Sequence, residues 1–200
     1  MTQPKATQPS FTDVGADILL FRQLLSPEVC QQIIQVAEWI TFDPSSILMG
    51  TVDPEVRSGG ILPLDAQHPV QRSTQQLLYE KIQLIQRALY QHYGIKFPQV
   101  EGFSILRYRP GESYRRHVDN LLLASRMMEL AQGIPTRDIS IVGYLNDEFE
   151  GGETYFDRQD IKIKPATGDV IAFPSYYTHP HAALPVTQGT KYAFTTWLFY

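Results

Sequence analysis

Residues 191–199 read KYAFTTWLF, in which aromatic and β-branched residues follow one another almost without interruption. Such residues favour a β-strand, which we predict over 192–199. The chain upstream, as far back as Gly94, holds further short runs of this kind between turn residues, at 103–109, 140–145, 153–156, 161–163 and 170–173. Their spacing is typical of a β-sandwich or barrel rather than of repeated βαβ units. The C-terminal half therefore predicts a β-roll.

The N-terminal half carries the signals of two helices. Ser26 is a good N-cap before Pro27, and apolar residues follow at helical spacing as far as Ile40. A second helix fits residues 70–93, with Gly94 as its expected C-cap. Several Pro and Gly residues predict a loop over 41–69, and a short buried strand is predicted at 18–21. We expect a mainly β protein with flanking helices (α+β), in which the two helices buttress the β-roll.

The composition is that of a globular protein. The 200 residues are 43% hydrophobic and 19% charged, which suits one domain. We expect the polar residues 1–16 to form a flexible tail and residues 17–200 to form a single domain. The 17 basic and 21 acidic residues give a net charge of −4, which argues against a protein that coats nucleic acids.

Cysteine usage and hydropathy favour a soluble, cytoplasmic protein. Cys30 is the only cysteine, so neither an intrachain disulfide nor a Cys-rich zinc site can form. The N-terminal MTQPKATQPS has no apolar segment typical of a secretory signal, and the longest apolar runs are too short to span a membrane. We therefore expect neither a membrane nor a nucleic acid among the partners.

A candidate metal site begins at His117-Val118-Asp119. On an extended segment, residues i and i+2 point to the same face, so the imidazole and the carboxylate can converge on one ion. A second histidine is available downstream in THPH, residues 178–181, where either His179 or His181 fits by composition. Two histidines and one carboxylate form the ligand set of non-haem Fe(II), which leaves three coordination positions open.

Lys191, at the start of the last predicted strand, is a second candidate. Strand alternation places it on one face with Ala193, Thr195 and Trp197. Because a buried ammonium group is unfavourable unless it is paired, a lysine among small residues near a metal site favours an anionic ligand. The alternative is that Lys191 only begins the strand in solvent.

These residues and their surroundings closely resemble the prolyl-4-hydroxylase-like branch of the 2-oxoglutarate/Fe(II) dioxygenases. The motifs that carry the resemblance are His117-Val118-Asp119, YLN at 144–146, GGET at 151–154 and HAALPVTQGTK at 181–191. In this family the third iron ligand stands four residues before the Pro of a Pro-Val pair, which selects His181 over His179. A basic residue ten positions later, here Lys191, holds the distal carboxylate of 2-oxoglutarate together with a tyrosine that matches Tyr108.

The resemblance implies a double-stranded β-helix (jelly roll) whose open mouth holds Fe(II) between His117, Asp119 and His181. It also implies an enzyme that uses 2-oxoglutarate and O2, with ascorbate in support, to hydroxylate a C–H bond while releasing succinate and CO2. The expected acceptor is a prolyl residue in a peptide or protein.

Three residues match positions that surround the substrate in this family: Tyr114, Arg137 and Trp197. The sequence departs from the family at Phe199, where peptide hydroxylases can carry a histidine. Residues 121–135 predict a short amphipathic helix directly after the metal motif, which either packs on the roll or forms a lid over the site.

Three other functions stay open at this point. A hydroxylase of a free amino acid or another small metabolite would need charged partners in a closed pocket, for which Arg137 and the Arg115-Arg116 pair are candidates. A non-catalytic cupin-like binding module would keep the roll and lack the Lys191 anchor. A zinc hydrolase would need a general base beside the metal, and the sequence shows no clear one.

Several polar residues near these motifs receive a plainer interpretation. The basic residues around the metal motif are expected to face acidic side chains at the surface: Arg107, Arg109, Arg115 and Arg116. His179 is expected in a surface loop, with a supporting position behind the metal ligands as the alternative, and Asp169 is expected in a turn rather than in a catalytic role.

Overall fold

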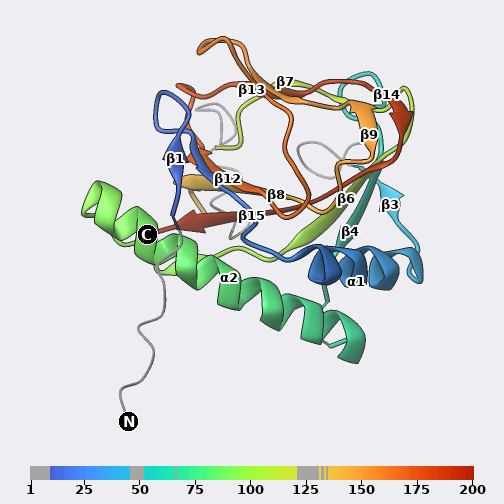
Figure 1. Ribbon diagram of the computed structural model, residues 1–200, viewed down its shortest axis with the longest axis horizontal. Coiled ribbons are helices and arrows are strands. Elements are labelled where there is room, and N and C mark those ends of the chain that lie inside the picture. Colours follow the sequence, from blue (N-terminus) through green and yellow to red (C-terminus); the bar gives the residue numbers. More distant parts are fainter. Residues whose placement is uncertain (1–9, 46–51, 66, 121–130, 132, 134) are drawn as a thin grey trace.

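The computed structural model describes residues 10–45, 52–65, 67–120, 131, 133 and 135–200, and antiparallel sheets form its body (Figure 1). Within these residues the larger sheet has the strand order β1-β2-β12-β8-β15-β6-β4-β3, with β5 paired to β15. A smaller sheet has the order β11-β10-β13-β7, and β14 pairs with β9. The strand bounds are Thr12–Asp13 (β1), Leu19–Phe21 (β2), Asp43–Pro44 (β3), Gly60–Pro63 (β4), Gln99–Val100 (β5), Ser104–Tyr108 (β6), Tyr114–His117 (β7), Ile139–Tyr144 (β8), Phe149–Gly151 (β9), Thr154–Phe156 (β10), Ile161–Ile163 (β11), Val170–Pro174 (β12), His181–Ala183 (β13), Val186–Gly189 (β14) and Lys191–Phe199 (β15).

Both predicted helices are present, and their ends follow from local chemistry. Helix α1 spans Pro27–Glu38, and the side chain of its N-cap Ser26 accepts a hydrogen bond from the backbone N–H of Val29. Helix α2 spans Pro69–Tyr93 and ends at Gly94, whose φ of 70° is the left-handed conformation that glycine adopts at low cost.

The two helices cover the outer face of the larger sheet, and the smaller sheet lies against its other face (Figure 1). Fully buried Leu78, Ile82 and Ile85 of α2 pack with Phe194 and Leu198 of β15 in the helix-side core. The sheets enclose two further clusters, one around Tyr144, Phe156 and Phe173 and one around Tyr108, Phe149 and Ala193. This arrangement of two facing sheets is the expected jelly roll, buttressed by two helices.

Strand β15 lies between β8 and β6 near the middle of the larger sheet. Its side chains alternate as predicted, because Phe194 and Leu198 belong to the helix-side core whereas Ala193 belongs to a cluster between the sheets. Lys191 starts the strand and pairs in register with Tyr108, the last residue of β6. The two residues expected to hold 2-oxoglutarate are therefore neighbours across one strand pair.

The structure corrects two expectations for the N-terminal half. Residues 41–69 are not only loop, because β4 pairs with β6 and β3 pairs with β4. Gly60 and Pro63 disfavour a strand locally, and pairing with a central strand overrides that preference. The flexible tail expected over 1–16 includes two residues of a strand, since Thr12 and Asp13 pair with Leu20 and Leu19, while residues 1–9 lie outside the described residues.

The amphipathic helix expected over 121–135 falls largely on residues 121–130, 132 and 134, which lie outside the described residues. In the part of the chain that the structure describes, neither helix combines the length and the apolar character needed to cross a bilayer.

Candidate active site

Three side chains that are distant in sequence meet at the edge of the smaller sheet. His117 ends β7, His181 begins β13, and the two residues face each other in register. Asp119 follows two residues after His117, and one ligand atom from each of the three residues lies within 4.8 Å of the others. The structure therefore brings together His117, Asp119 and His181. The second histidine of this cluster is His181 rather than His179.

Hydrogen bonds fix which nitrogen of each ring carries its proton. Nδ1 of His117 lies 2.8 Å from the carbonyl oxygen of Arg115, and Nδ1 of His181 lies 3.1 Å from that of His179. Because a carbonyl oxygen only accepts, both Nδ1 atoms must donate, so the lone pair of each ring in its neutral form is on Nε2. These Nε2 atoms lie 3.3 Å and 3.7 Å from the two carboxylate oxygens of Asp119. Two imidazole nitrogens and a carboxylate aimed at one point fit a divalent metal ion.

The protonation states of the buried pair suit the same role. Burial acts to raise the pKa of Asp119, but the neighbouring His181 and His117 rings oppose it and hold that pKa well below its usual range. Burial also lowers the pKa of His181 to about 4. At neutral pH the site therefore presents an anionic carboxylate and a neutral imidazole, which are the forms that bind metals.

Residues behind Asp119 hold it in place. The Ser140 hydroxyl is a hydrogen-bond partner of the Asp119 carboxylate and lies 2.8 Å from the hydroxyl of Ser175. Arg137 donates to the backbone carbonyl of Asp119 at 3.2 Å. Such partners orient a ligand before the metal arrives.

Aromatic rings surround the histidines. The Tyr114 ring stacks on His117 with 3.6 Å between centroids, and the Phe173 and Phe156 rings lie 4.8 Å and 5.6 Å from His181. These contacts restrict rotation of both imidazoles and exclude water from one side of the cluster.

Lys191 is buried rather than in solvent, with 2% of its surface exposed. Its ammonium group donates to the carbonyl of Gly152 at 2.6 Å and lies between 5.4 Å and 6.0 Å from the rings of Tyr144, Tyr108 and Phe149. Burial lowers the pKa of Lys191 to about 8, against the opposing effect of the Glu153 charge. Among the described residues it has one hydrogen-bond acceptor for three N–H donors, so the ammonium group fits a carboxylate ligand.

Gly152 and Tyr108 shape the space beside Lys191. Gly152 has φ of +67°, and a Cβ there would lie 3.3 Å from Cδ of Lys191, so the GGET motif keeps room for the lysine stem. Tyr108 is 3% exposed, and its pKa is raised by burial, although Arg57 nearby acts to lower it. Its hydroxyl therefore stays protonated and able to donate. The Asp119 charge also acts to raise the pKa of Tyr108.

The three residues matched to substrate positions lie around the same cluster. Arg137 forms a bidentate ion pair with Glu101, with N–O distances of 2.7 Å and 2.5 Å, and its guanidinium lies 3.6 Å from the centroid of the Trp197 ring. The indole N–H of Trp197 is buried and has no acceptor among the described residues. Tyr114 lies on the other side, against His117.

Arg57 and Glu101 also belong to the site, and the sequence alone does not single them out. Arg57 bridges to Tyr114, lies 4.6 Å over its ring and is a hydrogen-bond partner of Tyr108, while Glu101 holds Arg137. No local pattern marks either residue, because each acquires its role from a partner at least 36 positions away. The local sequence at 57–60, R-S-G-G, indicates a loop rather than a functional site.

The structure also tests the plainer expectations. His179 is not in an exposed loop, since it is 6% exposed and hydrogen bonded on both ring nitrogens. Three of the four basic residues do face acidic partners: Arg107 pairs with Glu38, Arg115 with Glu55 and Arg116 with Asp157. Asp169 is fully buried and pairs with Arg22, which is a structural role.

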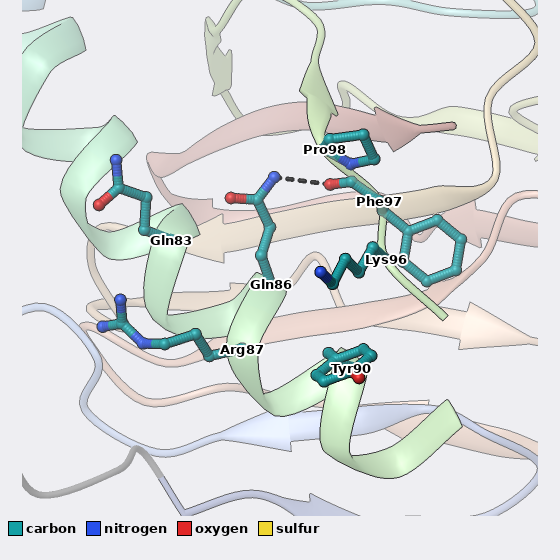
Figure 2. A pocket seen from close by; sticks show the side chains of 7 residues that line it. All are labelled: Gln83, Gln86, Arg87, Tyr90, Lys96, Phe97 and Pro98. Atoms are coloured by element: carbon teal, nitrogen blue, oxygen red, sulfur yellow. Dashed lines mark hydrogen bonds between the residues drawn. The ribbon is translucent and has the colours of Figure 1, made fainter. Parts of the chain in front are cut away.

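The structure has a pocket of about 340 Å³ elsewhere, between α2 and residues 96–98 (Figure 2). Side chains of α2 and of the segment after Gly94 line it, and Nε2 of Gln86 donates to the carbonyl of Phe97 across it at 2.6 Å. The pocket contains none of the residues described above and is separate from the candidate site.

A jelly roll with two histidines and a carboxylate at one sheet edge and a buried lysine on the facing sheet is typical of iron oxygenases that use a dicarboxylate co-substrate. Residues 103–199 match the family model of the 2OG-Fe(II) oxygenase superfamily. A protein named "Putative prolyl 4-hydroxylase" from Acanthamoeba polyphaga mimivirus is 30% identical over 187 residues, which are 89% of this chain and 72% of that protein.

Solved structures agree with the sequence comparison. A prolyl hydroxylase from Trichoplax adhaerens, in complex with a hypoxia inducible factor oxygen degradation domain peptide fragment, has a TM-score of 0.73 at 20% identity and covers 92% of this chain and 83% of that one. The viral collagen prolyl hydroxylase vCPH from Paramecium Bursaria Chlorella virus-1, in its 2OG complex, has a TM-score of 0.67 at 25% identity over 92% of this chain and 96% of that one. Vertebrate prolyl 3-hydroxylases also match, although the chain spans only 13% to 20% of their length.

The chain belongs to the 2OG-Fe(II) oxygenase superfamily and is an oxidoreductase. Within the superfamily it is prolyl-4-hydroxylase-like, and membership implies Fe(II), 2-oxoglutarate and O2 as its cofactor and co-substrates.

Proposed function

We propose that this oxygenase hydroxylates a prolyl residue in a peptide or protein, with release of succinate and CO2. The observation that carries the proposal is the placement of two complementary groups on facing sheets. The cluster of His117, Asp119 and His181 lies at the edge of the smaller sheet, and Lys191 lies buried in the larger one. A single dicarboxylate that spans the two sheets would satisfy both.

In this proposal Fe(II) is held by Nε2 of His117, Nε2 of His181 and the Asp119 carboxylate. The hydrogen bonds from both Nδ1 atoms to backbone carbonyls leave Nε2 as the ring nitrogen that would face the metal. Bound Fe(II) supplies the oxidising chemistry with 2-oxoglutarate and O2. The surrounding rings of Tyr114, Phe156 and Phe173 keep bulk water from the ligands.

Lys191 and Tyr108 would hold the distal carboxylate of 2-oxoglutarate. The ammonium group supplies a charge-assisted hydrogen bond, and the protonated Tyr108 hydroxyl supplies a second donor from the paired strand. The positive charges of Fe(II) and Lys191 balance the negative charges of Asp119 and 2-oxoglutarate, so the loaded site is close to neutral. Near neutrality reduces the cost of burying these charges.

Tyr114, Arg137 and Trp197 would bind the substrate. The relative named as a prolyl 4-hydroxylase and the neighbour with a bound peptide support a peptidyl proline as the acceptor. The buried indole N–H of Trp197 is a donor suited to a peptide carbonyl.

A free amino acid is the second candidate substrate, and the geometry around Arg137 disfavours it. A free α-carboxylate needs a cation to pair with, but both arms of Arg137 already bind Glu101. A peptide, which offers neutral carbonyls instead, fits the occupied guanidinium better.

The test is succinate release by the full chain with Fe(II), 2-oxoglutarate and ascorbate, against proline peptides, matched peptides with alanine in place of proline, and free amino acids. We expect product only with proline peptides, in amounts that match succinate. Product from free proline but not from any peptide would contradict the peptidyl substrate. Ascorbate dependence and a cytoplasmic location belong to the same proposal; omission of ascorbate from this assay tests the first.

A further inference from the structure

His179 connects the expected iron ligand His181 to the N-terminal turn at residues 15–17. Its ring is 6% exposed, and Nε2 lies 2.6 Å from the carbonyl oxygen of Ala16, 163 positions away in the sequence. Nδ1 lies 2.9 Å from the hydroxyl of Thr178. The backbone carbonyl of His179 in turn accepts the hydrogen bond from Nδ1 of His181.

The chemical groups involved determine which atom donates and which accepts in each of these hydrogen bonds. The Ala16 carbonyl only accepts, so Nε2 of His179 carries a proton and donates. In the neutral ring Nδ1 then accepts, and the Thr178 hydroxyl donates to it. Both ring nitrogens are thus satisfied inside the protein, and His179 has no lone pair left for a metal ion. This explains why His181, and not His179, joins the cluster with His117 and Asp119.

The turn that receives the His179 hydrogen bond is held in an unfavourable conformation. Ala16 and Asp17 have φ of 53° and 63°, in the left-handed region that residues other than glycine seldom adopt. Local hydrogen bonds from Val14 N–H to Ile18 and from Ile18 N–H to Gly15 close the turn. A strained turn persists when the surrounding structure supports it, and His179 is such a support.

Other contacts fasten the loop that carries His179. Arg158 and Gln159 donate to the carbonyls of Tyr177 and Thr178 at 2.9 Å and 2.8 Å. The backbone N–H of His179 donates to the carbonyl of Tyr176. The backbone between β12 and β13 is therefore fixed on one side by the 158–159 turn and on the other by the N-terminal turn.

We propose that His179 is a positioning residue for His181, and that through it the N-terminal turn at 15–17 supports the metal site. The inference rests on the proposed role of His117, Asp119 and His181 as metal ligands. It goes beyond that role, because it assigns a function to a residue and a segment that touch neither metal nor substrate. By linkage, metal binding and order in the turn must reinforce each other.

The test measures Mn(II) affinity of the full-length protein without 2-oxoglutarate, by the paramagnetic resonance signal of free and bound Mn(II). His179→Phe keeps a ring of similar size and removes both hydrogen bonds, and we expect about tenfold weaker Mn(II) binding, the low end of what loss of such a support costs. His179→Gln, which can still donate to Ala16 and accept from Thr178, should recover most of the affinity.

Gln86→Met is the matched control. It removes another side-chain N–H to carbonyl hydrogen bond of 2.6 Å, between α2 and Phe97 (Figure 2), and should leave Mn(II) affinity unchanged. His117→Ala reports on the site itself: if it leaves Mn(II) binding intact, the proposed ligands are wrong and the inference falls with them. If His117→Ala abolishes binding while His179→Phe stays within twofold of wild type, only the inference is overturned.

Amide hydrogen exchange gives a second readout, which reports directly on the N-terminal turn. The amides of Val14 and Ile18 should exchange more slowly once Mn(II) is bound, and His117→Ala should remove this slowing, which separates it from direct binding at Asp13, Asp17 and His92 beside the turn. Exchange that is the same with and without Mn(II) would overturn the link between the turn and the site.

Discussion

A single buried ammonium group, that of Lys191, carries much of the specificity for 2-oxoglutarate in the proposed mechanism. Its pKa of about 8 lies below the usual value for lysine because burial disfavours the charged form. The unfolded chain therefore binds this proton more tightly than the folded chain, and the charge lowers the stability of the ligand-free protein at neutral pH. A residue that destabilises the empty enzyme is expected where a ligand supplies the missing partner.

Removal of the Lys191 charge should have opposite effects on 2-oxoglutarate binding and on the stability of the ligand-free protein. Lys191→Met should weaken 2-oxoglutarate binding by about tenfold to a hundredfold, because a charge-assisted hydrogen bond contributes about 1.5–3 kcal/mol. The same variant should stabilise the ligand-free protein at pH 7 by about 1–3 kcal/mol, since it removes the buried charge. Calorimetric titration and thermal unfolding measure the two effects. Unchanged 2-oxoglutarate affinity would show that another group holds the carboxylate.

The same pKa predicts a pH dependence. Below about pH 8 Lys191 is an ammonium ion in the ligand-free protein, and above it the neutral amine loses its hold on the carboxylate. Affinity for 2-oxoglutarate should thus fall as pH rises from 7 to 9.5. Lys191→Arg keeps its charge throughout and serves as the control, with a flat profile. A wild-type affinity that does not change over this range would contradict the assignment.

Arg137 and Trp197 act together at the proposed substrate side, since the guanidinium lies 3.6 Å from the centroid of the Trp197 ring. Arg137→Ala and Trp197→Ala should each lower the ratio of hydroxylated peptide to succinate. Turnover of 2-oxoglutarate without peptide should be largely retained in Trp197→Ala, because the contact to Asp119 comes from Arg137. Product and succinate are quantified side by side. A wild-type ratio in both variants would place the substrate elsewhere.

At the scale of elements, the pairing of β7 with β13 brings His117 opposite His181, and the pairing of β6 with β15 brings Tyr108 opposite Lys191. Each sheet thus contributes one pair of functional residues through its strand register. A slip of one residue in either pair would turn one partner to the opposite face.

Helix α2 supports the larger sheet without touching the site. Ile85 is fully buried in the helix-side core, and Ile85→Ala should lower the free energy of unfolding by about 2–5 kcal/mol. Mn(II) and 2-oxoglutarate affinities of the folded variant should stay at wild-type values. Denaturant unfolding and titration test both statements, and a loss of affinity in the folded variant would mean that α2 contributes to the site geometry.

The elements differ in how well the sequence predicts them, for physical reasons. Helix α2 was predicted to within one residue because its apolar spacing and Gly94 are local signals. Strand β4 was missed, since Gly60 and Pro63 suggest a loop and only pairing with β6 makes them a strand. In the site, His117 and Asp119 could be predicted from their spacing, and His181 and Lys191 from the family resemblance. The partners Glu101, Arg57 and Ala16 could not, because only tertiary packing brings them there.

At the scale of the molecule, the two sheets of the jelly roll divide the site between them. The smaller sheet carries the expected metal ligands, and the larger sheet carries the expected 2-oxoglutarate anchor and lies over the helix-side core (Figure 1). A mouth between two rigid sheets keeps both groups in fixed relation while loops around it select the substrate.

The most direct measurement of the proposed function uses isotopically labelled O2 with Fe(II), 2-oxoglutarate and a proline peptide. Each turnover of the wild-type protein should place one labelled oxygen atom in succinate and one in the hydroxyl group of the peptide, as mass spectrometry would show. His117→Ala and His181→Ala, folded to the same extent, should give neither labelled product. Wild-type levels of labelled hydroxyproline from either variant would contradict the proposed iron site.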